Sequence, residues 1–300
     1  AEKPIGIAVE RKNGEMASVK TYIHGTSEMR DADHYYIERL VKTLLWMKGG
    51  FRVYVCGDED TAEYLKSVYC DGGQQHFDWD YMANVFEHPF EILSVDMLPE
   101  AKDSPKAIGG HLSGCRIGFD AGGSDMKVAA VVDGETIWAE EIVWLPKLAE
   151  DISYHHEHIK AAILKAAEHM PSFDAVGVST AGVLVANRAM VSHLFLKVPK
   201  DTQGEACKNV YVDVLEELGV PYAVANDGDV AALAASMAMD VDGVLECTGF
   251  YCSKAGFRII SYSGHDIDSH QAFATGDFLC FCNLFWCEYH LLYLPFHEHG

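Results

Sequence analysis

The sequence predicts an α/β protein with two folded units: a small α/β domain at residues 1–102 and a larger domain with a mixed sheet at residues 115–246. The chain has 300 residues, a length typical of about two domains. Strand-like and helix-like patterns alternate within both regions. A stretch without periodicity, rich in proline, glycine and serine, separates them at residues 103–114 and predicts a linker.

The first unit is expected to fold in the order β-β-α-β-α. An Asn13-Gly14 dipeptide between two apolar runs indicates a tight hairpin turn. The next apolar run has helical spacing and ends at Gly49-Gly50, and acidic N-capping candidates precede the second helix. The predicted elements are strands at residues 4–9 and 17–23, a helix at 34–48, a strand at 51–57 and a helix that begins near residue 58.

The second unit begins with three strands and continues with alternating helices and strands. Asp133-Gly134 predicts another hairpin turn, and Gly219 predicts the end of a helix. This order is that of an RNase H-like sheet. The predicted elements are strands at residues 115–120, 126–133 and 136–144, a helix at 155–169, a strand at 175–180, a helix at 208–218, a strand at 222–226 and a helix at 230–239.

Charge and composition exclude several classes of function. The formal net charge is −22, so the chain repels nucleic-acid backbones and no nucleic-acid partner is expected. A phosphate-bearing ligand therefore needs a local positive site, made by backbone N–H groups or a placed lysine. Residues 278–296 approach the length of a membrane span, but polar residues and a proline interrupt them, so no membrane anchor is expected. Charges stand at residues 1–14 where a secretory signal would be apolar, which favours a reducing cytoplasmic setting.

The strongest local pattern is a phosphate-loop candidate, the stretch GFDAGGSDMK. Asp120 ends one predicted strand, and Gly122 and Gly123 allow the backbone to approach a phosphate closely. Backbone N–H groups and the Ser124 hydroxyl can then bind phosphate oxygens, and Asp120 can hold Mg²⁺. Lys127 is expected to support this site. The alternative interpretation is an ordinary hairpin turn.

A second pattern, VANDGDVAALA, places a carboxylate at the tip of a buried strand. Ligands of open α/β sheets bind at such carboxyl ends. Asp227 there can accept a proton from a hydroxyl that attacks a phosphate, and Asn226 can orient the substrate. The alternative is that Asp227 or Asp229 caps the following helix.

These segments resemble the ROK family (repressor, open reading frame, kinase). The first matches the Asp-x-Gly-Gly-(Thr/Ser)-x-x-Lys phosphate-1 motif of the actin, Hsp70 and sugar-kinase superfamily. The second is similar to the ROK stretch Glu-Asn-Asp-Ala-Asn-Ala-Ala-Ala-Leu-Ala, with Ala225 in place of the glutamate and Asp229 in place of the second asparagine. Between them, AVGVSTAGV is similar to the family's Gly-x-Gly-x-Pro-Gly segment. The resemblance covers residues 115–246.

The resemblance implies the N-lobe of an actin-like ATPase domain. It implies a ROK-type, ATP-dependent carbohydrate kinase, a glucokinase-like phosphotransferase that is incomplete in this chain, or an inactive remnant of such a kinase. It implies ATP and Mg²⁺ as cofactors and a small-molecule sugar as substrate, and a homo-oligomer is a further expectation. Asp227 takes the role of general base, and Asn226, Thr180 and Gly182 line the sugar side. The phosphate and Mg²⁺ side comprises Asp120, Gly122, Gly123, Ser124 and Lys127. The alternative is a noncatalytic sugar-binding or regulatory protein on the same fold.

Residues 247–300 depart from the family pattern. They hold five of the nine cysteines, and the second ATPase lobe is expected to be truncated or aberrant. In one interpretation Cys280, Cys282, Cys287 and His265 form a zinc site, because their spacing resembles that of the ROK zinc motif. In the other interpretation, residues from about 246 onward are translated out of frame.

Three histidines, His155, His156 and His158, stand close together in the predicted helix at 155–169. Neighbouring positions on a helix point to different faces, so they are not expected to converge on a metal. They are predicted to be solvated surface residues.

Overall fold

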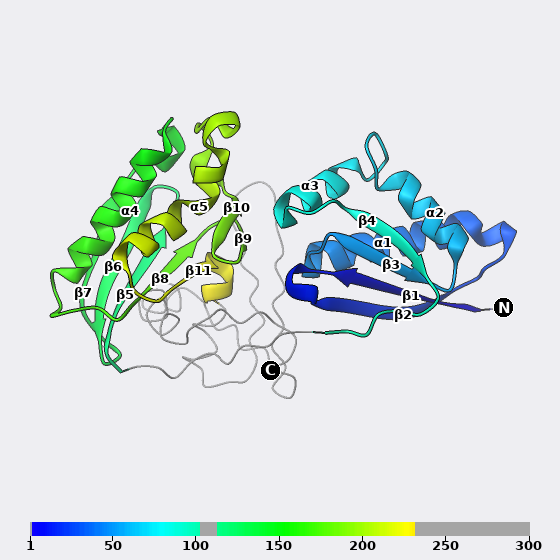
Figure 1. The fold of residues 1–300 in the computed structure, drawn as a ribbon, viewed down its shortest axis with the longest axis horizontal. Coiled ribbons are helices and arrows are strands. Elements are labelled where there is room, and N and C mark those ends of the chain that lie inside the picture. The colour runs from blue at the N-terminus through cyan, green and yellow to red at the C-terminus, as the bar shows by residue number, and fades with distance from the viewer. Residues whose placement is uncertain (1, 103–112, 232–300) are drawn as a thin grey trace, which may run out of the picture. The chain divides into compact units, whose positions relative to one another are not determined.

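The chain divides into two compact units, Ala1–Ser104 and Pro105–Gly300. The structure is a computed structural model that describes residues 2–102 and 113–231 (Figure 1). Several predictions fall outside the described residues. They are most of the linker, most of the last helix, the zinc candidates Cys280, Cys282, Cys287 and His265, and the segment to which the frame-shift hypothesis applies.

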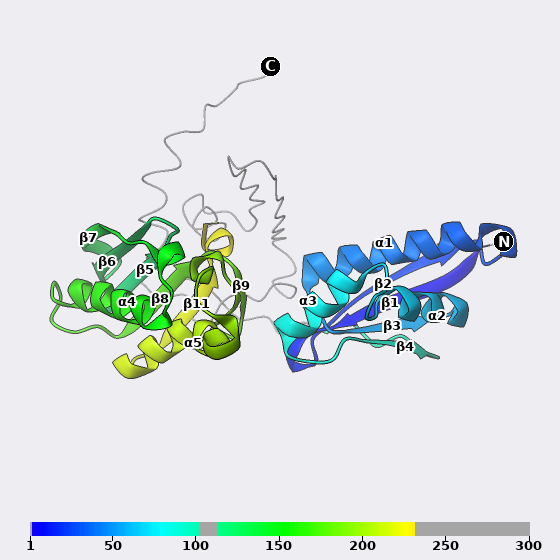
Figure 2. The same ribbon diagram turned by 90° about the horizontal axis from the view of Figure 1, so that it is seen from above.

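The first unit is a four-stranded sheet with helices, in the strand order β2-β1-β3-β4. β1 pairs antiparallel with both β2 and β3, and β3 pairs parallel with β4. Figure 2 shows α1 running lengthwise along this sheet. Its elements are β1 (Lys3–Glu10), β2 (Met16–Ile23), α1 (Arg30–Lys48), β3 (Arg52–Cys56), α2 (Glu59–Val68), α3 (His76–Phe86) and β4 (Glu91–Val95), with short 3-10 turns at Lys12–Gly14 and Ser27–Met29.

Local chemistry explains where these elements turn and end. Asn13 has a φ of 63° in the turn between β1 and β2, a conformation that asparagine tolerates well. Gly49 ends α1 with a φ of 75°, and Asp58 caps α2 by accepting a hydrogen bond from Thr61 N at 3.0 Å. Residues 5–9 of β1 are all buried, and the alternate residues Ile5, Ile7 and Val9 belong to the apolar cluster that also contains residues of α1 and α2.

The second unit contains a five-stranded mixed sheet in the order β11-β8-β5-β6-β7. β5, β6 and β7 are antiparallel neighbours, while β8 is parallel to β5 and β11 is parallel to β8. This is the RNase H-like arrangement that the sequence predicts. The elements are β5 (Cys115–Ala121), β6 (Asp125–Val132), β7 (Glu135–Val143), a 3-10 turn at Pro146–Leu148, α4 (Ile152–Ala167), β8 (Ala175–Thr180), β9 (Val183–Val185), β10 (Arg188–Val191), a 3-10 turn at His193–Phe195, α5 (Lys200–Leu218) and β11 (Tyr222–Asn226).

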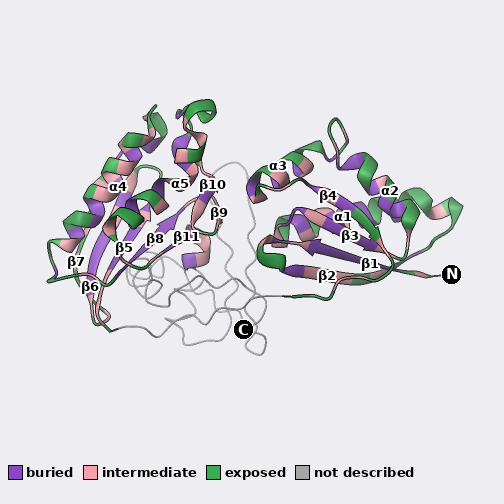
Figure 3. Ribbon diagram, viewed as in Figure 1, coloured by how far each residue is buried: buried purple, intermediate pink, exposed green. Residues whose placement is uncertain are grey.

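The core of this unit lies between the sheet and the helices α4 and α5. Phe119, Val178 and Val224 come from three neighbouring strands and share one buried cluster with Ile159 of α4 and Val214 of α5. Figure 3 shows the central strands buried and the outer faces of both helices exposed. Burial of such apolar side chains contributes about 1.5–3 kcal/mol each. The core therefore holds the carboxyl ends of β5, β8 and β11 in a fixed order.

Within the described part of the chain, no helix combines the length and the apolar character needed to cross a membrane.

Candidate functional site

The three parallel strands of the second unit end in register at one edge of the sheet. Asp120 of β5 lies opposite Ser179 of β8, and Ser179 lies opposite Ala225 of β11. One residue further on, Thr180 lies opposite Asn226. Figure 1 shows a short helical turn, in yellow, directly after β11, and residues 227–231 form it. The two sequence patterns, more than 100 residues apart, thus end at the same edge.

Asp120 and Asp227 are close enough to influence each other electrostatically. Burial raises the pKa of Asp120 to about 6, and the negative charge of Asp227 adds to this rise. The Ser179 hydroxyl and the positive charge of Lys127 oppose it. Burial and a neighbouring negative charge both disfavour the ionised form of a carboxyl group. A bound cation would stabilise that ionised form.

Ser179 is a buried polar residue next to this carboxyl. Its side chain is almost completely buried, and within the described residues its hydroxyl makes no hydrogen bond of normal geometry. The hydroxyl still lowers the pKa of Asp120, so it interacts with that carboxyl without forming a hydrogen bond of normal geometry, whereas buried polar groups are normally fully satisfied. Magnesium in proteins is typically held by one or two carboxylates together with water and substrate phosphates. The Asp120 carboxylate and the Ser179 hydroxyl fit a hydrated Mg²⁺ of that kind.

The loop between β5 and β6 is a tight turn pinned by a tryptophan. Gly122 N donates to Asp125 O at 3.0 Å, and a Cβ on Gly122 would lie 2.7 Å from that oxygen. The Trp144 indole donates to Gly122 O at 2.8 Å, and Trp144 N donates to Ser124 O at 3.2 Å. Within the described residues, the N–H groups of Gly123 and Ser124 have no acceptor. Gly123 and Ser124 are both exposed, so these two donors are available to a ligand at a tight turn, as a phosphate-binding loop requires.

Lys127 lies on β6 directly opposite Asp120. Its ammonium donates to Asp125 Oδ2 at 2.9 Å. Burial opposes the charge on Lys127, but the hydrogen bond to Asp125 and the charges of Asp120 and Glu141 leave the pKa of Lys127 raised. Lys127 is therefore a charged, paired residue that supports the loop from the neighbouring strand.

The Asn226 side chain joins the tip of β11 to the turn after β8. Its Nδ2 donates to Gly182 O at 2.8 Å, and its Oδ1 accepts a hydrogen bond from Gly228 N at 2.9 Å. Gly182 has a φ of 130°, and a Cβ there would lie 2.2 Å from Val191 O. Asp227 also accepts a hydrogen bond from Gly228 N, at 2.9 Å. The structure thus brings together Asn226 and Gly182, which the sequence placed in two separate segments.

Thr180 is directed away from the Asp120 side of the sheet. Its register partner on β5 is Ala121, and successive side chains of a strand point to opposite faces. Thr180 is completely buried, and its hydroxyl lies 2.8 Å from the hydroxyl of Tyr211 on α5. The Thr180 hydroxyl is therefore engaged in the core.

The predicted solvation of the three histidines is wrong for His155. His155 is completely buried, and burial lowers its pKa. Its Nε2 lies 3.0 Å from Pro146 O and 3.1 Å from Leu194 O, so Nε2 carries the proton and donates to these carbonyls. His156 contacts Glu217 on α5 instead, and the histidines do not converge. Among the residues that the structure describes, no group of three or more metal-ligating side chains is found.

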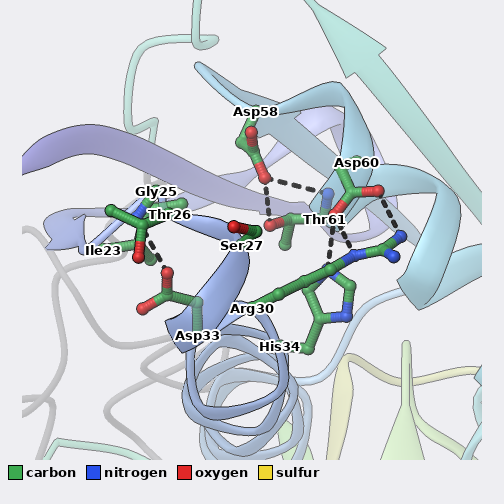
Figure 4. A pocket seen from close by; sticks show the side chains of 10 residues that line it. All are labelled: Ile23, Gly25, Thr26, Ser27, Arg30, Asp33, His34, Asp58, Asp60 and Thr61. Carbon is green, nitrogen blue, oxygen red and sulfur yellow. Dashed lines mark hydrogen bonds and ion pairs between the residues drawn. The ribbon is translucent and has the colours of Figure 1, made fainter.

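The first unit contains a small cavity of about 180 Å³, shown in Figure 4. Each of its three aspartates already has a partner within the unit. Asp33 accepts a hydrogen bond from Gly25 N at 2.9 Å, Asp60 accepts one from Arg30 Nε at 2.8 Å, and Asp58 caps α2. These acids are therefore engaged in holding the ends of α1 and α2.

Comparison with known proteins gives partial structural likenesses. No family model matches the chain, and no curated protein matches it. A ROK hexokinase from Thermus thermophilus is similar over 41% of this chain and 38% of its own length, with 22% identity and a TM-score of 0.32. A glucokinase from Parabacteroides distasonis is similar over 45% of this chain and 36% of its own, with 18% identity and a TM-score of 0.34.

A ROK family transcriptional regulator, a homologue of the E. coli MLC protein, is similar over 67% of this chain and 55% of its own, with 13% identity and a TM-score of 0.33. The chain therefore spans less than two thirds of the length of each of these three proteins. The assignment of an RNase H-like sheet rests on the strand order of β11-β8-β5-β6-β7 and not on these likenesses.

Proposed function

We propose that this chain carries the nucleotide-binding lobe of a ROK-type carbohydrate kinase, which transfers a phosphoryl group from MgATP to a sugar hydroxyl. The observation that carries the proposal is the meeting of Asp120 and Asp227 at the carboxyl edge of the sheet, where the charge of Asp227 contributes to the raised pKa of Asp120. Phosphoryl transfer needs one carboxylate that holds Mg²⁺ beside the phosphates and one that accepts the proton of the attacking hydroxyl, and two carboxylates beside a glycine turn suit these two roles.

The phosphate side of the proposed site is the turn between β5 and β6. The N–H groups of Gly123 and Ser124, with the Ser124 hydroxyl, bind phosphate oxygens, and Gly122 keeps the turn tight. Asp120 holds Mg²⁺ when the nucleotide is bound, and the ion then offsets the negative charge of the phosphates. Ser179 supplies a hydroxyl beside the same carboxylate, and Lys127 keeps Asp125 in place.

The sugar side of the proposed site is the tip of β11. Asp227 accepts the proton of the attacking sugar hydroxyl as general base. The hydrogen bond from Asn226 to Gly182 fixes the distance between the two segments that line the sugar. The backbone at Gly182 lines this side without a side chain, while Thr180 supports it from the core through Tyr211.

The proposed cofactors are ATP and Mg²⁺, and the proposed substrate is a small-molecule sugar. We also propose that the protein forms a homo-oligomer. A reducing cytoplasmic setting is part of the same proposal. The four cysteines of the described residues, which are all free thiols, support that setting; they are Cys56, Cys70, Cys115 and Cys207.

The test is sugar-dependent ADP release, measured with a coupled assay on a panel of hexoses. Turnover of at least one hexose is expected if residues 247–300 complete the second lobe of the kinase. D227N is then expected to lower kcat by 10²-fold or more, as loss of a general base does. D213N is the matched control, because Asp213 is an exposed acid on α5. A folded protein that turns over no hexose contradicts the kinase proposal. Stabilisation by a sugar but not by MgATP would support the noncatalytic sugar-binding alternative instead.

A further inference from the structure

The ammonium of Lys147 lies against the glycine turn between β5 and β6. A Cβ on Gly123 would lie only 2.9 Å from Lys147 Nζ and 3.2 Å from Lys147 Cε. The lysine can approach the backbone this closely because residue 123 has no side chain. A positive charge therefore lies beside the turn that carries the two N–H groups of Gly123 and Ser124.

Lys147 has no counter-ion within the described residues. No ion pair or hydrogen bond of its side chain is formed there, whereas Lys127 on the other side of the turn is paired with Asp125 at 2.9 Å. The chain carries 45 acidic residues against 23 lysines and arginines, so acidic partners are abundant. An unpaired lysine at this turn of such an acidic chain is the local positive charge that a phosphate ligand needs.

The fold holds the segment of Lys147 next to the turn. Trp144, three residues earlier, donates to the carbonyls of Gly122 and Ser124. Pro146, directly before Lys147, accepts a hydrogen bond at 3.0 Å from the buried His155. The backbone at residues 144–147 is thus tied to the loop on one side and to α4 on the other. The lysine head stays exposed, but its point of attachment is fixed.

We infer that Lys147 is a phosphate-binding residue of the proposed site, which neutralises a terminal phosphate of the bound nucleotide at the Gly122-Gly123 turn. The inference rests on the proposed function. Without Lys147, the site holds the acids Asp120, Asp125 and Asp227 against one paired lysine. A nucleoside triphosphate adds further negative charge, so the exposed ammonium of Lys147 has a direct electrostatic role there. Lysine binds phosphate as a point charge and tolerates small changes of geometry.

The experiment measures the Kd of MgADP and of a non-hydrolysable MgATP analogue by calorimetry, with the full chain. K147M is expected to weaken the triphosphate analogue by about 10-fold or more, in line with the loss of a charge-assisted contact. K147R keeps the charge and is expected to recover most of the affinity. K160M is the matched control. Lys160 is a half-exposed lysine of α4 that pairs with Glu217 of α5, outside the proposed site. The thermal stability of ligand-free K147M is expected to equal that of the wild type.

Two results overturn the inference, and they can be told apart. If the wild type binds the analogue and K147M binds it within twofold of the wild-type Kd, Lys147 has no phosphate-binding role and the proposed function stands. If the folded wild type binds neither nucleotide, the proposed function fails, and this inference fails with it. Weaker binding by K147M that K147R does not restore also contradicts a role as a point charge.

Discussion

Replacement of Asp120 by asparagine is expected to stabilise the ligand-free protein at neutral pH. Burial is the main reason that the pKa of Asp120 rises from its ordinary 3.8 to about 6. A tenfold change in proton affinity is worth about 1.4 kcal/mol, so this difference corresponds to at most ~3 kcal/mol. Asp120 keeps part of its surface in solvent, and we expect a gain of about 1–3 kcal/mol in the free energy of unfolding.

The sign of the effect follows from where the proton binds. Between about pH 4 and pH 6 the folded state holds the Asp120 proton and the unfolded state has released it. The wild type therefore loses stability as the pH rises through this window, and the loss is complete above it. D120N has no carboxyl to ionise, so its advantage over the wild type should be small at pH 4 and largest at pH 7–8.

The assay is urea denaturation of wild type and D120N at five pH values from 4 to 8, without metal or nucleotide. D213N serves as the control, since it removes an acid of α5 outside the site. A difference between D120N and wild type that does not grow with pH, or a less stable D120N at pH 8, would refute the argument. The same variant is expected to lose Mg²⁺-dependent nucleotide affinity, so that a gain in stability accompanies a loss of the proposed function.

Three further substitutions test individual contacts. W144F leaves the half-buried Gly122 carbonyl without its indole donor, so it should lower the free energy of unfolding by about 1–3 kcal/mol and weaken the binding of the MgATP analogue measured by calorimetry. Y211F removes the partner of the buried Thr180 hydroxyl and should cost about 1–3 kcal/mol in urea denaturation, with a sugar KM within a few-fold of wild type. G182A places a Cβ against a β10 carbonyl at a φ of 130°, so it should cost at least about 1–3 kcal/mol. Unchanged unfolding midpoints would contradict each of these expectations.

Turn residues and apolar periodicity were enough to predict most of the fold. The Asn13-Gly14 and Asp133-Gly134 dipeptides lie at the turns of two observed hairpins, and Gly219 ends α5 in the left-handed conformation. The strand at residues 175–180 has the predicted bounds. These features depend on local conformational preferences, which a single sequence carries.

Elements without such local signals were missed. α3 begins after Gln75, which makes no side-chain cap, and β4 buries only one of its five residues fully. The β9–β10 hairpin turns at Ala186 and Asn187, both with positive φ, and alanine gives no sign of such a turn. α5 begins at Lys200, whereas the predicted start was residue 208. The first two turns were missed because they carry few buried apolar residues.

The candidate site shows the same division between local and long-range information. Asp120 and Asp227 could be chosen from motifs, since each motif is a short strand-and-turn pattern. Ser179, Trp144 and Lys147 could not, because their relevance depends on which strand or turn lies beside them. His155 was misassigned for that reason, since only packing against the Pro146 carbonyl shows that it is buried. Motif spacing therefore identifies residues at strand ends. The residues that contact them from neighbouring strands and turns can be identified only from the three-dimensional structure.

The central claim is that Asp120 and Asp227 share one site, and the pKa of Asp120 tests it most directly. Carboxyl carbon NMR of the ligand-free chain, titrated from pH 3 to pH 8, gives this value in wild type and in D227N. We expect a pKa near 6 for Asp120 in the wild type and a lower value in D227N, still above 3.8 because burial remains. The same pKa in both proteins, or an ordinary value in the wild type, would contradict it.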